Sequence, residues 1–268
     1  MQDPTKYIYK TVGDREIELL FYPPEEKQPA PSPLLILIPG GGWNLSDAAS
    51  MYGMARAAAE ELRAAGWAAA ALSYRNHRQD GVNMRQMVAD ILDGAGWLAA
   101  HAGELGIDPG RFYTCGHSAG GHLALVLAYA SRDLLAEERV NPAPFTVRAA
   151  APLSPPVMLR AGESRPWLAF PVDDLFVGCR GDYAAFSPLD MVKAGAGVPT
   201  LTAVGERDSL VFPLNGQELT AALIQKGIPA ELLVSRRGGH CFEPVDAPDS
   251  SPDLAGILPR IARFFLEN

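Results

Sequence analysis

The chain has few cysteines, few histidines, no excess of positive charge and no long apolar run. Three cysteines in 268 residues do not suggest a disulfide framework. The five histidines show no tight spacing with Asp or Glu, so we expect no catalytic metal. The formal net charge of −8 argues against nucleic acid or an anionic membrane surface as the main partner. No apolar run reaches transmembrane length, so no membrane partner is expected either.

Several other signatures are also missing. The sequence has no G-x-G-x-x-G after a strand and no P-loop, so we predict no nucleotide or other cofactor. It contains no internal repeat, and its 48% hydrophobic and 20% charged composition is ordinary for a globular protein. We therefore predict a single domain over residues 1–268. The first residues lack the basic-then-apolar layout of a secretory signal, which predicts a cytoplasmic location. The sequence leaves open whether the protein forms a homodimer.

The segment over residues 114–122 is the most informative part of the chain. Residues 116–120 read Gly-His-Ser-Ala-Gly and match G-x-S-x-G, the nucleophile elbow of serine hydrolases. Residues 111–115 are short, aromatic and β-prone, and residues 121–130 are rich in Ala and Leu, which is typical of a buried helix. A serine on a sharp strand-to-helix turn is displayed for attack, so we predict Ser118 as the nucleophile.

Two later loops supply the partners that a nucleophilic serine needs. Asp208 follows a predicted strand over residues 200–204, and His240 follows a predicted strand over residues 231–235. The order Ser, Asp, His is the one found along α/β-hydrolase chains, and each residue lies beyond the carboxyl end of a strand, where open α/β sheets bind ligands. We therefore predict Ser118, Asp208 and His240 as a catalytic triad, with Glu206 and Asp190 as alternative acids.

An oxyanion hole is predicted upstream of the serine. The apolar run over residues 34–38 has the length of a buried strand and leads into Pro-Gly-Gly-Gly-Trp at residues 39–43. Glycines leave backbone N–H groups open to a ligand atom. We predict that Gly41, Gly42 and Ala119 donate N–H groups to the oxyanion. Pro39 replaces the His of the commoner pattern, and so removes a side chain that would brace the loop.

These motifs resemble those of the α/β-hydrolases, and within them the small lipolytic carbohydrate esterases of the acetylxylan- and feruloyl-esterase-like group. Further matching motifs are Leu45-Ser46 and residues 72–75, 186–189 and 205–211, so the resemblance spans roughly residues 30–268. It implies an α/β fold with a mostly parallel eight-stranded sheet and helices on both faces. It also implies a serine carboxylic-ester hydrolase for a small-molecule substrate with a short acyl group, with a sugar-borne acetate as one option.

The remaining segments fit this fold. We expect an antiparallel pair of strands over residues 6–10 and 16–22, and further strands over residues 67–72 and 147–153. Helices are expected over residues 51–65, 83–100, 211–226 and 253–266. Residues 23–33 are rich in proline and form a loop, which leaves no room for a long N-terminal cap.

Residues 154–189 break the alternation of strands and helices. This stretch holds five prolines, and long irregular segments in compact domains are usually functional. We predict a small lid in which Trp167 and Phe170, together with Trp43 beside the glycine loop, contact the substrate. The alternative is a packed surface insertion without substrate contact.

Neighbouring motifs leave other functions open. The motifs that carry the resemblance are also similar to those of hormone-sensitive-lipase-like esterases, kynurenine formamidases and prolyl-peptidase domains. Amide hydrolysis by an arylformamidase or a peptidase-like enzyme is therefore an alternative. A non-catalytic ligand receptor could use the same fold, although it would not need Ser118, Asp208 and His240 together. His117 and His122 flank the serine, and neither is predicted to be the base.

Overall fold

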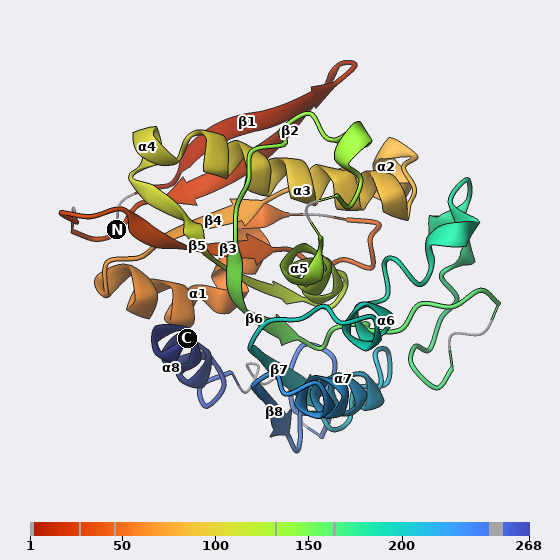
Figure 1. The fold of residues 1–268 in the computed structure, drawn as a ribbon. Helices are drawn as coiled ribbons and strands as arrows, with labels where there is room; N and C mark the ends of the chain where they lie inside the picture. The colour runs from red at the N-terminus through yellow and green to blue at the C-terminus, as the bar shows by residue number, and fades with distance from the viewer. Residues whose placement is uncertain (1–2, 27, 46, 132, 163–164, 247–253) are drawn as a thin grey trace.

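A twisted eight-stranded sheet forms the centre of the molecule (Figure 1). The computed structural model describes residues 3–26, 28–45, 47–131, 133–162, 165–246 and 254–268. The strands lie side by side in the order β1-β2-β4-β3-β5-β6-β7-β8. Their bounds are β1 Thr5–Val12, β2 Arg15–Tyr22, β3 Ser32–Ile38, β4 Ala68–Leu72, β5 Ile107–His117, β6 Val147–Leu153, β7 Thr200–Gly205 and β8 Ala230–Ser235.

Most neighbouring strands run parallel. β1 pairs with β2 and β2 with β4 in antiparallel fashion, whereas every pair from β4 across to β8 is parallel. Parallel neighbours need a long crossover, and here helices supply it. The predicted α/β-hydrolase fold, with a mostly parallel eight-stranded sheet, is therefore confirmed. Its consequence for the site is that the carboxyl ends of β3, β5, β7 and β8 open at the same edge.

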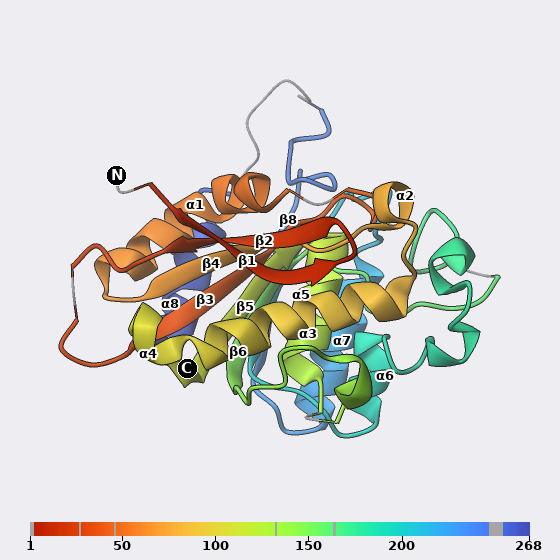
Figure 2. The same cartoon turned by 90° about the horizontal axis from the view of Figure 1, so that it is seen from above.

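Helices cover both faces of the sheet (Figure 2). α1 and α8 pack together on one face, over a core that includes Leu35, Leu37 and Phe265. α3, α5, α6 and α7 cover the other face, over a larger core that includes Leu34, Phe112 and Leu219. The helix bounds are α1 Ala48–Ala64, α2 His77–Asp80, α3 Met84–Ala100, α4 Ala102–Leu105, α5 Ala119–Tyr129, α6 Pro188–Lys193, α7 Leu214–Gln225 and α8 Leu258–Glu267.

The central strands are apolar on both faces because helices cover both faces. β3 is buried along nearly its whole length, and β4 is a run of four alanines and Leu72, all of them buried. α3 begins where the sequence predicts, because Asn83 forms a capping box with Gln86. Within the described residues, no helix is both long and apolar enough to cross a membrane.

The described residues between 154 and 189 form an irregular segment that is fastened to the rest of the molecule. It carries two short 3₁₀ helices, Asp173–Phe176 and Arg180–Asp182, and leads into α6. Its described residues are tied to the start of α3, because Arg85 pairs with Asp182 at 2.8 Å and the Asn83 side chain donates to the Val177 carbonyl at 3.1 Å. A third short 3₁₀ helix, Ala136–Glu138, lies elsewhere, between α5 and β6.

The element boundaries differ from the predictions mainly at helix starts. α7 begins at Leu214 rather than at residue 211, because the residues before it form the turn that holds Asp208. α8 begins at Leu258, and the predicted start at residue 253 lies outside the described residues. Ser46 of the Leu45-Ser46 motif also lies outside them.

Candidate active site

Ser118 lies on a strained turn between β5 and α5. Its φ and ψ of 55° and −122° place it in a region that L-residues rarely adopt, at a cost of about 1–3 kcal/mol. A Cβ atom at Gly116 would lie 2.3 Å from the Gly120 carbonyl oxygen, and one at Gly120 would lie 2.1 Å from the Ile38 carbonyl oxygen. The backbones therefore approach too closely for any other residue, which is why the motif needs glycine at both positions.

The structure brings Ser118, His240 and Asp208 together in one chain of hydrogen bonds. His240 Nε2 lies 2.8 Å from Ser118 Oγ, and His240 Nδ1 lies 2.7 Å from Asp208 Oδ2. Since the Asp208 carboxylate accepts, Nδ1 carries the proton and Nε2 is left as an acceptor for the serine hydroxyl. The imidazole is thus held in the tautomer that can take a proton from Ser118.

The Asp208 carboxylate is fixed by the turn that follows β7. Its side chain is fully buried, and Oδ1 accepts hydrogen bonds from the backbone N–H groups of Leu210 and Val211, both at 2.9 Å. These two bonds leave Oδ2 aimed at His240. Of the two alternative acids, Glu206 is exposed to solvent, and Asp190 pairs with Arg160 at 2.7 Å.

The glycine loop after β3 runs directly against the serine. A Cβ atom at Gly40 would lie 3.4 Å from Ser118 Cβ, and Gly41 and Gly42 have φ values of 117° and 60°. Within the described part of the chain, no hydrogen-bond acceptor is found for the N–H groups of Gly41 and Gly42. Ala119 is the first residue of α5, where backbone N–H groups have no partner inside the helix. These are the groups expected to receive an oxyanion.

The three predicted substrate-binding aromatic residues have different surroundings. The Trp43 side chain is fully buried, and its indole Nε1 donates to His122 Nδ1 at 3.3 Å. Phe170 is half-buried, and with Trp43 it lines a hollow of about 240 Å³ beside the glycine loop. Trp167 is also half-buried, and its carbonyl accepts from the backbone N–H of Phe212 at 3.0 Å. Trp167 does not line this hollow.

His117 has a contact that the sequence did not indicate. Its Nε2 donates to the backbone carbonyl of His240 at 2.9 Å, and the two rings lie 4.9 Å apart. Burial, together with the nearby His240 ring, lowers the pKa of His117 to about 4, so the ring is neutral at pH 7. The only signal in the sequence is its place beside the nucleophile, and that place does not reveal where the ring points.

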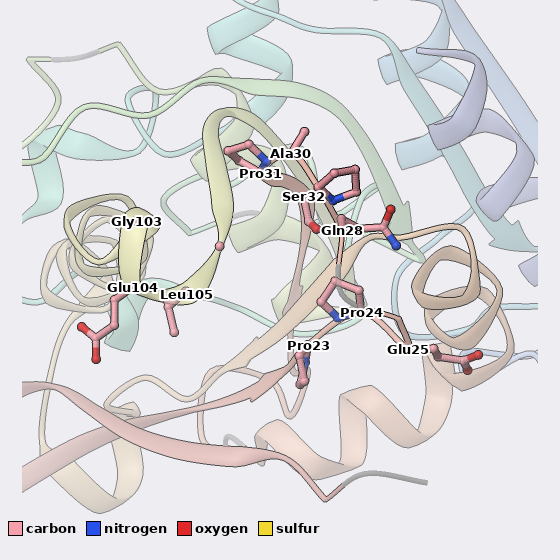
Figure 3. A pocket seen from close by; sticks show the side chains of 12 residues that line it. Pro23, Pro24, Glu25, Gln28, Ala30, Pro31, Ser32, Gly103, Glu104 and Leu105 are labelled. Atoms are coloured by element: carbon pink, nitrogen blue, oxygen red, sulfur yellow. The ribbon is translucent and has the colours of Figure 1, made fainter.

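A larger hollow lies away from these residues. It measures about 580 Å³ and is lined by residues of the proline-rich loop, including Pro23 and Pro31, and by Gly103 and Leu105 of α4 (Figure 3). This places it at the amino end of β3, opposite the edge that carries Ser118. Among the described residues, no group of three or more His, Cys, Asp or Glu side chains is arranged to hold a metal ion.

Comparison with known proteins agrees with the geometry. The BD-FAE family model matches residues 19–223, which is more than two thirds of the chain and includes Ser118 and Asp208. Esterase LipQ of Mycobacterium tuberculosis is 26% identical over 202 residues, and the probable carboxylic ester hydrolase LipM of the same organism is 31% identical over 121 residues. These alignments cover 73% and 45% of this chain, but only 47% and 27% of the relatives.

Solved structures match over nearly the whole length. The propionate-bound form of the thermophilic esterase Est2 from Thermogutta terrifontis has a TM-score of 0.82 and 26% identity, and the match covers 99% of this chain and 94% of that one. The apo form of esterase 2 from the same organism has a TM-score of 0.83 and 25% identity, with 100% and 95% covered. The chain therefore belongs to the BD-FAE family and has an α/β-hydrolase fold.

Proposed function

We propose that this chain hydrolyses short-chain carboxylic esters through an acyl-enzyme intermediate on Ser118. The observation that carries the proposal is the continuous chain Asp208–His240–Ser118, with bonds of 2.7 and 2.8 Å. His240 Nε2 takes the hydroxyl proton as Ser118 Oγ attacks the ester carbonyl carbon. Asp208 holds the imidazole and stabilises the imidazolium that forms.

The oxyanion of the tetrahedral intermediate is received by the N–H groups of Gly41, Gly42 and Ala119. They act in a site partly closed to water, where each hydrogen bond counts for more than in bulk solvent. The imidazolium of His240 then protonates the leaving alkoxide, and the alcohol departs. A water molecule, deprotonated by the same Nε2, attacks the acyl-Ser118 carbonyl. The collapse of the second intermediate releases the carboxylic acid and restores the serine.

A short acyl group is supported by the matching structures. Forms of Thermogutta terrifontis Est2 are described as propionate-bound and butyrate-bound, and both acids have short chains. The proline-rich loop between β2 and β3 also leaves no room there for a large cap that would enclose a long chain. A methylene adds about 0.8 kcal/mol to binding only where a pocket can bury it. We therefore expect efficiency to fall as the acyl chain lengthens.

The alcohol half of the substrate is assigned to the hollow beside the glycine loop. Its wall on one side is Gly42 and Asn44, and on the other side the segment that carries Phe170 and Asp174, with Arg78 of α2 also lining it. A ring that can stack, next to charged and amide groups, suits a hydroxyl-rich alcohol such as an acetylated sugar. Residues 154–189 would then act as a fixed lid over this half of the substrate.

The proposal is tested with p-nitrophenyl acetate, butyrate and octanoate. We expect acetate or butyrate to be cleaved best, with kcat/KM falling steeply by octanoate. Ser118→Ala should keep the fold and lose at least about 1,000-fold in kcat, because only the oxyanion hole and binding remain. Substantial turnover by purified Ser118→Ala, or kcat/KM that rises steadily to octanoate, would contradict the proposal.

A covalent probe gives a second test that does not depend on the choice of ester. The same Thermogutta terrifontis enzyme has been solved phosphorylated by paraoxon. If Ser118 is the nucleophile here, paraoxon should add one diethylphosphoryl group per chain, release one p-nitrophenolate and lose activity in step. Peptide mass spectrometry should place the group on Ser118. Assaying an aryl formamide and an acetylated xylooligosaccharide in parallel separates the amide and sugar-ester alternatives.

A further inference from the structure

The glycine loop that faces Ser118 is pinned at both ends. At its start, the Tyr74 hydroxyl donates to the Pro39 carbonyl at 3.1 Å. At its end, the Trp43 carbonyl accepts from the backbone N–H of His77 at 2.8 Å, and the Trp43 indole is fully buried. Gly41 and Gly42 lie between these anchors and can rotate more freely than other residues. The Gly41 carbonyl, which shares a peptide plane with the Gly42 N–H, accepts from the N–H groups of Asn44 and Leu45 at 3.0 and 3.2 Å. The direction of the glycine N–H groups is therefore set by this turn together with what holds Pro39 and Trp43.

The backbone of Trp43 is itself in an unusual conformation. Its φ of 60° lies in the left-handed region, directly after Gly41 at 117° and Gly42 at 60°. A bulky residue stays in that region only when its surroundings hold it there. The side chain supplies the hold, because its indole ring meets the His122 ring edge-to-face at 5.3 Å and Nε1 donates to His122 Nδ1 at 3.3 Å.

His122 is held in a single tautomer. It is fully buried on the first turn of α5, and its Nε2 lies 2.7 Å from the Phe186 carbonyl oxygen. A carbonyl can only accept, so Nε2 carries the proton and Nδ1 is free to accept. An indole N–H can only donate, and it fills that place. The bonds thus run in one direction, from Trp43 through His122 to Phe186 in the segment of residues 154–189.

His122 also belongs to the helix that carries the other half of the oxyanion hole. Its backbone N–H donates to the Ser118 carbonyl at 3.0 Å, in the turn that displays Ser118 and the N–H of Ala119. The Trp43–His122 bond therefore joins the glycine loop to the nucleophile helix. It fixes the N–H groups of Gly41 and Gly42 relative to that of Ala119, which is the spacing that an oxyanion must fit.

We propose that Trp43 and His122 are positioning residues of the oxyanion hole, joined by the indole-to-imidazole hydrogen bond. Trp43 then acts from beneath the loop, and its effect on the substrate passes through Gly41 and Gly42. The pair supplies the brace that is lost when Pro39 stands in place of histidine. This inference rests on the proposed ester hydrolysis at Ser118 and adds to it the residues that shape the hole.

The test compares Trp43→Phe and His122→Gln with a matched control. Trp43→Phe removes the indole N–H but keeps an aromatic ring. His122→Gln can place its NH₂ near Nε2 to donate to Phe186, and then has no acceptor at the position of Nδ1 for Trp43. Trp67→Phe is the control, because Trp67 is buried against Tyr113 and Phe265 on the opposite face of the sheet. Each variant is assayed with p-nitrophenyl acetate well below its melting temperature.

We expect Trp43→Phe and His122→Gln each to lower kcat by about 10- to 100-fold with little change in KM, since a misplaced oxyanion-hole donor acts on the transition state. The inhibition constant of a short-chain trifluoromethyl ketone, which forms an oxyanion on Ser118, should rise by a similar factor. The double variant should be little worse than either single one, because both break the same bond. Trp67→Phe should keep the wild-type kcat.

The inference is overturned if the folded variants keep kcat and ketone inhibition within about twofold of the wild type, or if Trp67→Phe loses as much as Trp43→Phe. If Trp43→Phe does not fold, His122→Gln decides alone. Paraoxon labelling of Ser118 in the wild type distinguishes a failure of this inference from a failure of the proposed function. If the wild type is labelled and active but the Trp43 and His122 variants keep wild-type kcat, only this inference fails. If the wild type is neither labelled nor active, the proposed function fails.

Discussion

His117 Nε2 lies 2.9 Å from the backbone carbonyl oxygen of His240. The residue before Ser118 thus anchors the loop that carries His240, although 123 positions separate His117 from His240 in the chain. Burial keeps the His117 ring neutral, so it carries a single proton. That proton is on Nε2, because the carbonyl can only accept. His117 therefore fixes the His240 backbone while Asp208 fixes the His240 ring.

This contact gives the first prediction. His117→Gln should keep much of the activity, because the side-chain amide can place an N–H close to the position of Nε2. His117→Ala leaves the His240 carbonyl without its donor and opens a cavity beneath the base, so we expect kcat to fall about tenfold or more with KM nearly unchanged. Steady-state kinetics on p-nitrophenyl acetate measures both. Equal activities for the Gln and Ala variants would show that the bond does not matter.

The second prediction concerns the acid. Asp208→Asn should be severe, because an amide at this position can hold His240 in the wrong tautomer and cannot stabilise the imidazolium. We expect a loss in kcat on the order of 1,000-fold or more. Glu206→Gln is the matched control, since Glu206 is exposed two residues away, and it should behave like the wild type. A dead Glu206→Gln beside an active Asp208→Asn would reverse the assignment.

The third prediction concerns stability at acid pH. Burial lowers the pKa of both His117 and His122 to about 4 in the folded protein, against about 6.5 when unfolded. The unfolded chain therefore binds more protons between pH 6.5 and pH 4, so this contribution is present above pH 6.5 and is lost as the pH falls toward 4. Each ring should lower the free energy of unfolding by about 2 kcal/mol when the pH falls from 7 to 5.

Urea unfolding at pH 7 and at pH 5 checks this expectation. Carboxylates titrate in the same range, so the comparison is made between variants. His117→Gln removes one of the two rings that titrate and should lose about 2 kcal/mol less than the wild type on going from pH 7 to pH 5. The same pH dependence in both proteins would mean that the pKa of His117 does not differ between the folded and unfolded states.

Local patterns were sufficient to predict the sheet, most helices and the three residues that meet at the site. The apolar run of β3, the capping residue Asn83 and the glycines around Ser118 each act within a few residues, so their structural effect is written in the nearby sequence. Asp208 was predictable because a loop after a strand in an α/β sheet opens at the ligand edge, whatever the details of packing.

The supporting contacts were not predictable, because they join residues far apart in the chain. Trp43 was expected to contact the substrate, since it follows the glycines, and that contact stays a prediction. The sequence did not indicate that its buried indole donates to His122, 79 positions away. Nothing near either residue indicates the other. The segment of residues 154–189 shows the same limit, since its composition indicates an irregular stretch but not which loop it holds in place.

That segment holds the turn that carries Asp208, the proposed acid. The backbone N–H of Ala169 donates to the Leu210 carbonyl at 2.9 Å, and the N–H of Phe212 donates to the Trp167 carbonyl at 3.0 Å. Asn215 closes the arrangement from a fully buried position. Its amide nitrogen donates to the carbonyls of Trp167 and Phe212, and its oxygen accepts from the N–H of Val157.

The fourth prediction follows from Asn215. Asn215→Ala leaves the buried N–H of Val157 without its acceptor, at a cost of about 1–3 kcal/mol, and removes one donor each from the Trp167 and Phe212 carbonyls. It thereby loosens the turn that aims Asp208 at His240. Ser187→Ala is the control, because the fully buried Ser187 hydroxyl bonds Leu159 and Tyr183 within the same segment and does not touch the acid turn. Both variants should have lower melting temperatures, but only Asn215→Ala should lose about tenfold or more in kcat when both are assayed well below melting. Equal losses in kcat for the two variants would reduce the role of Asn215 to general stability.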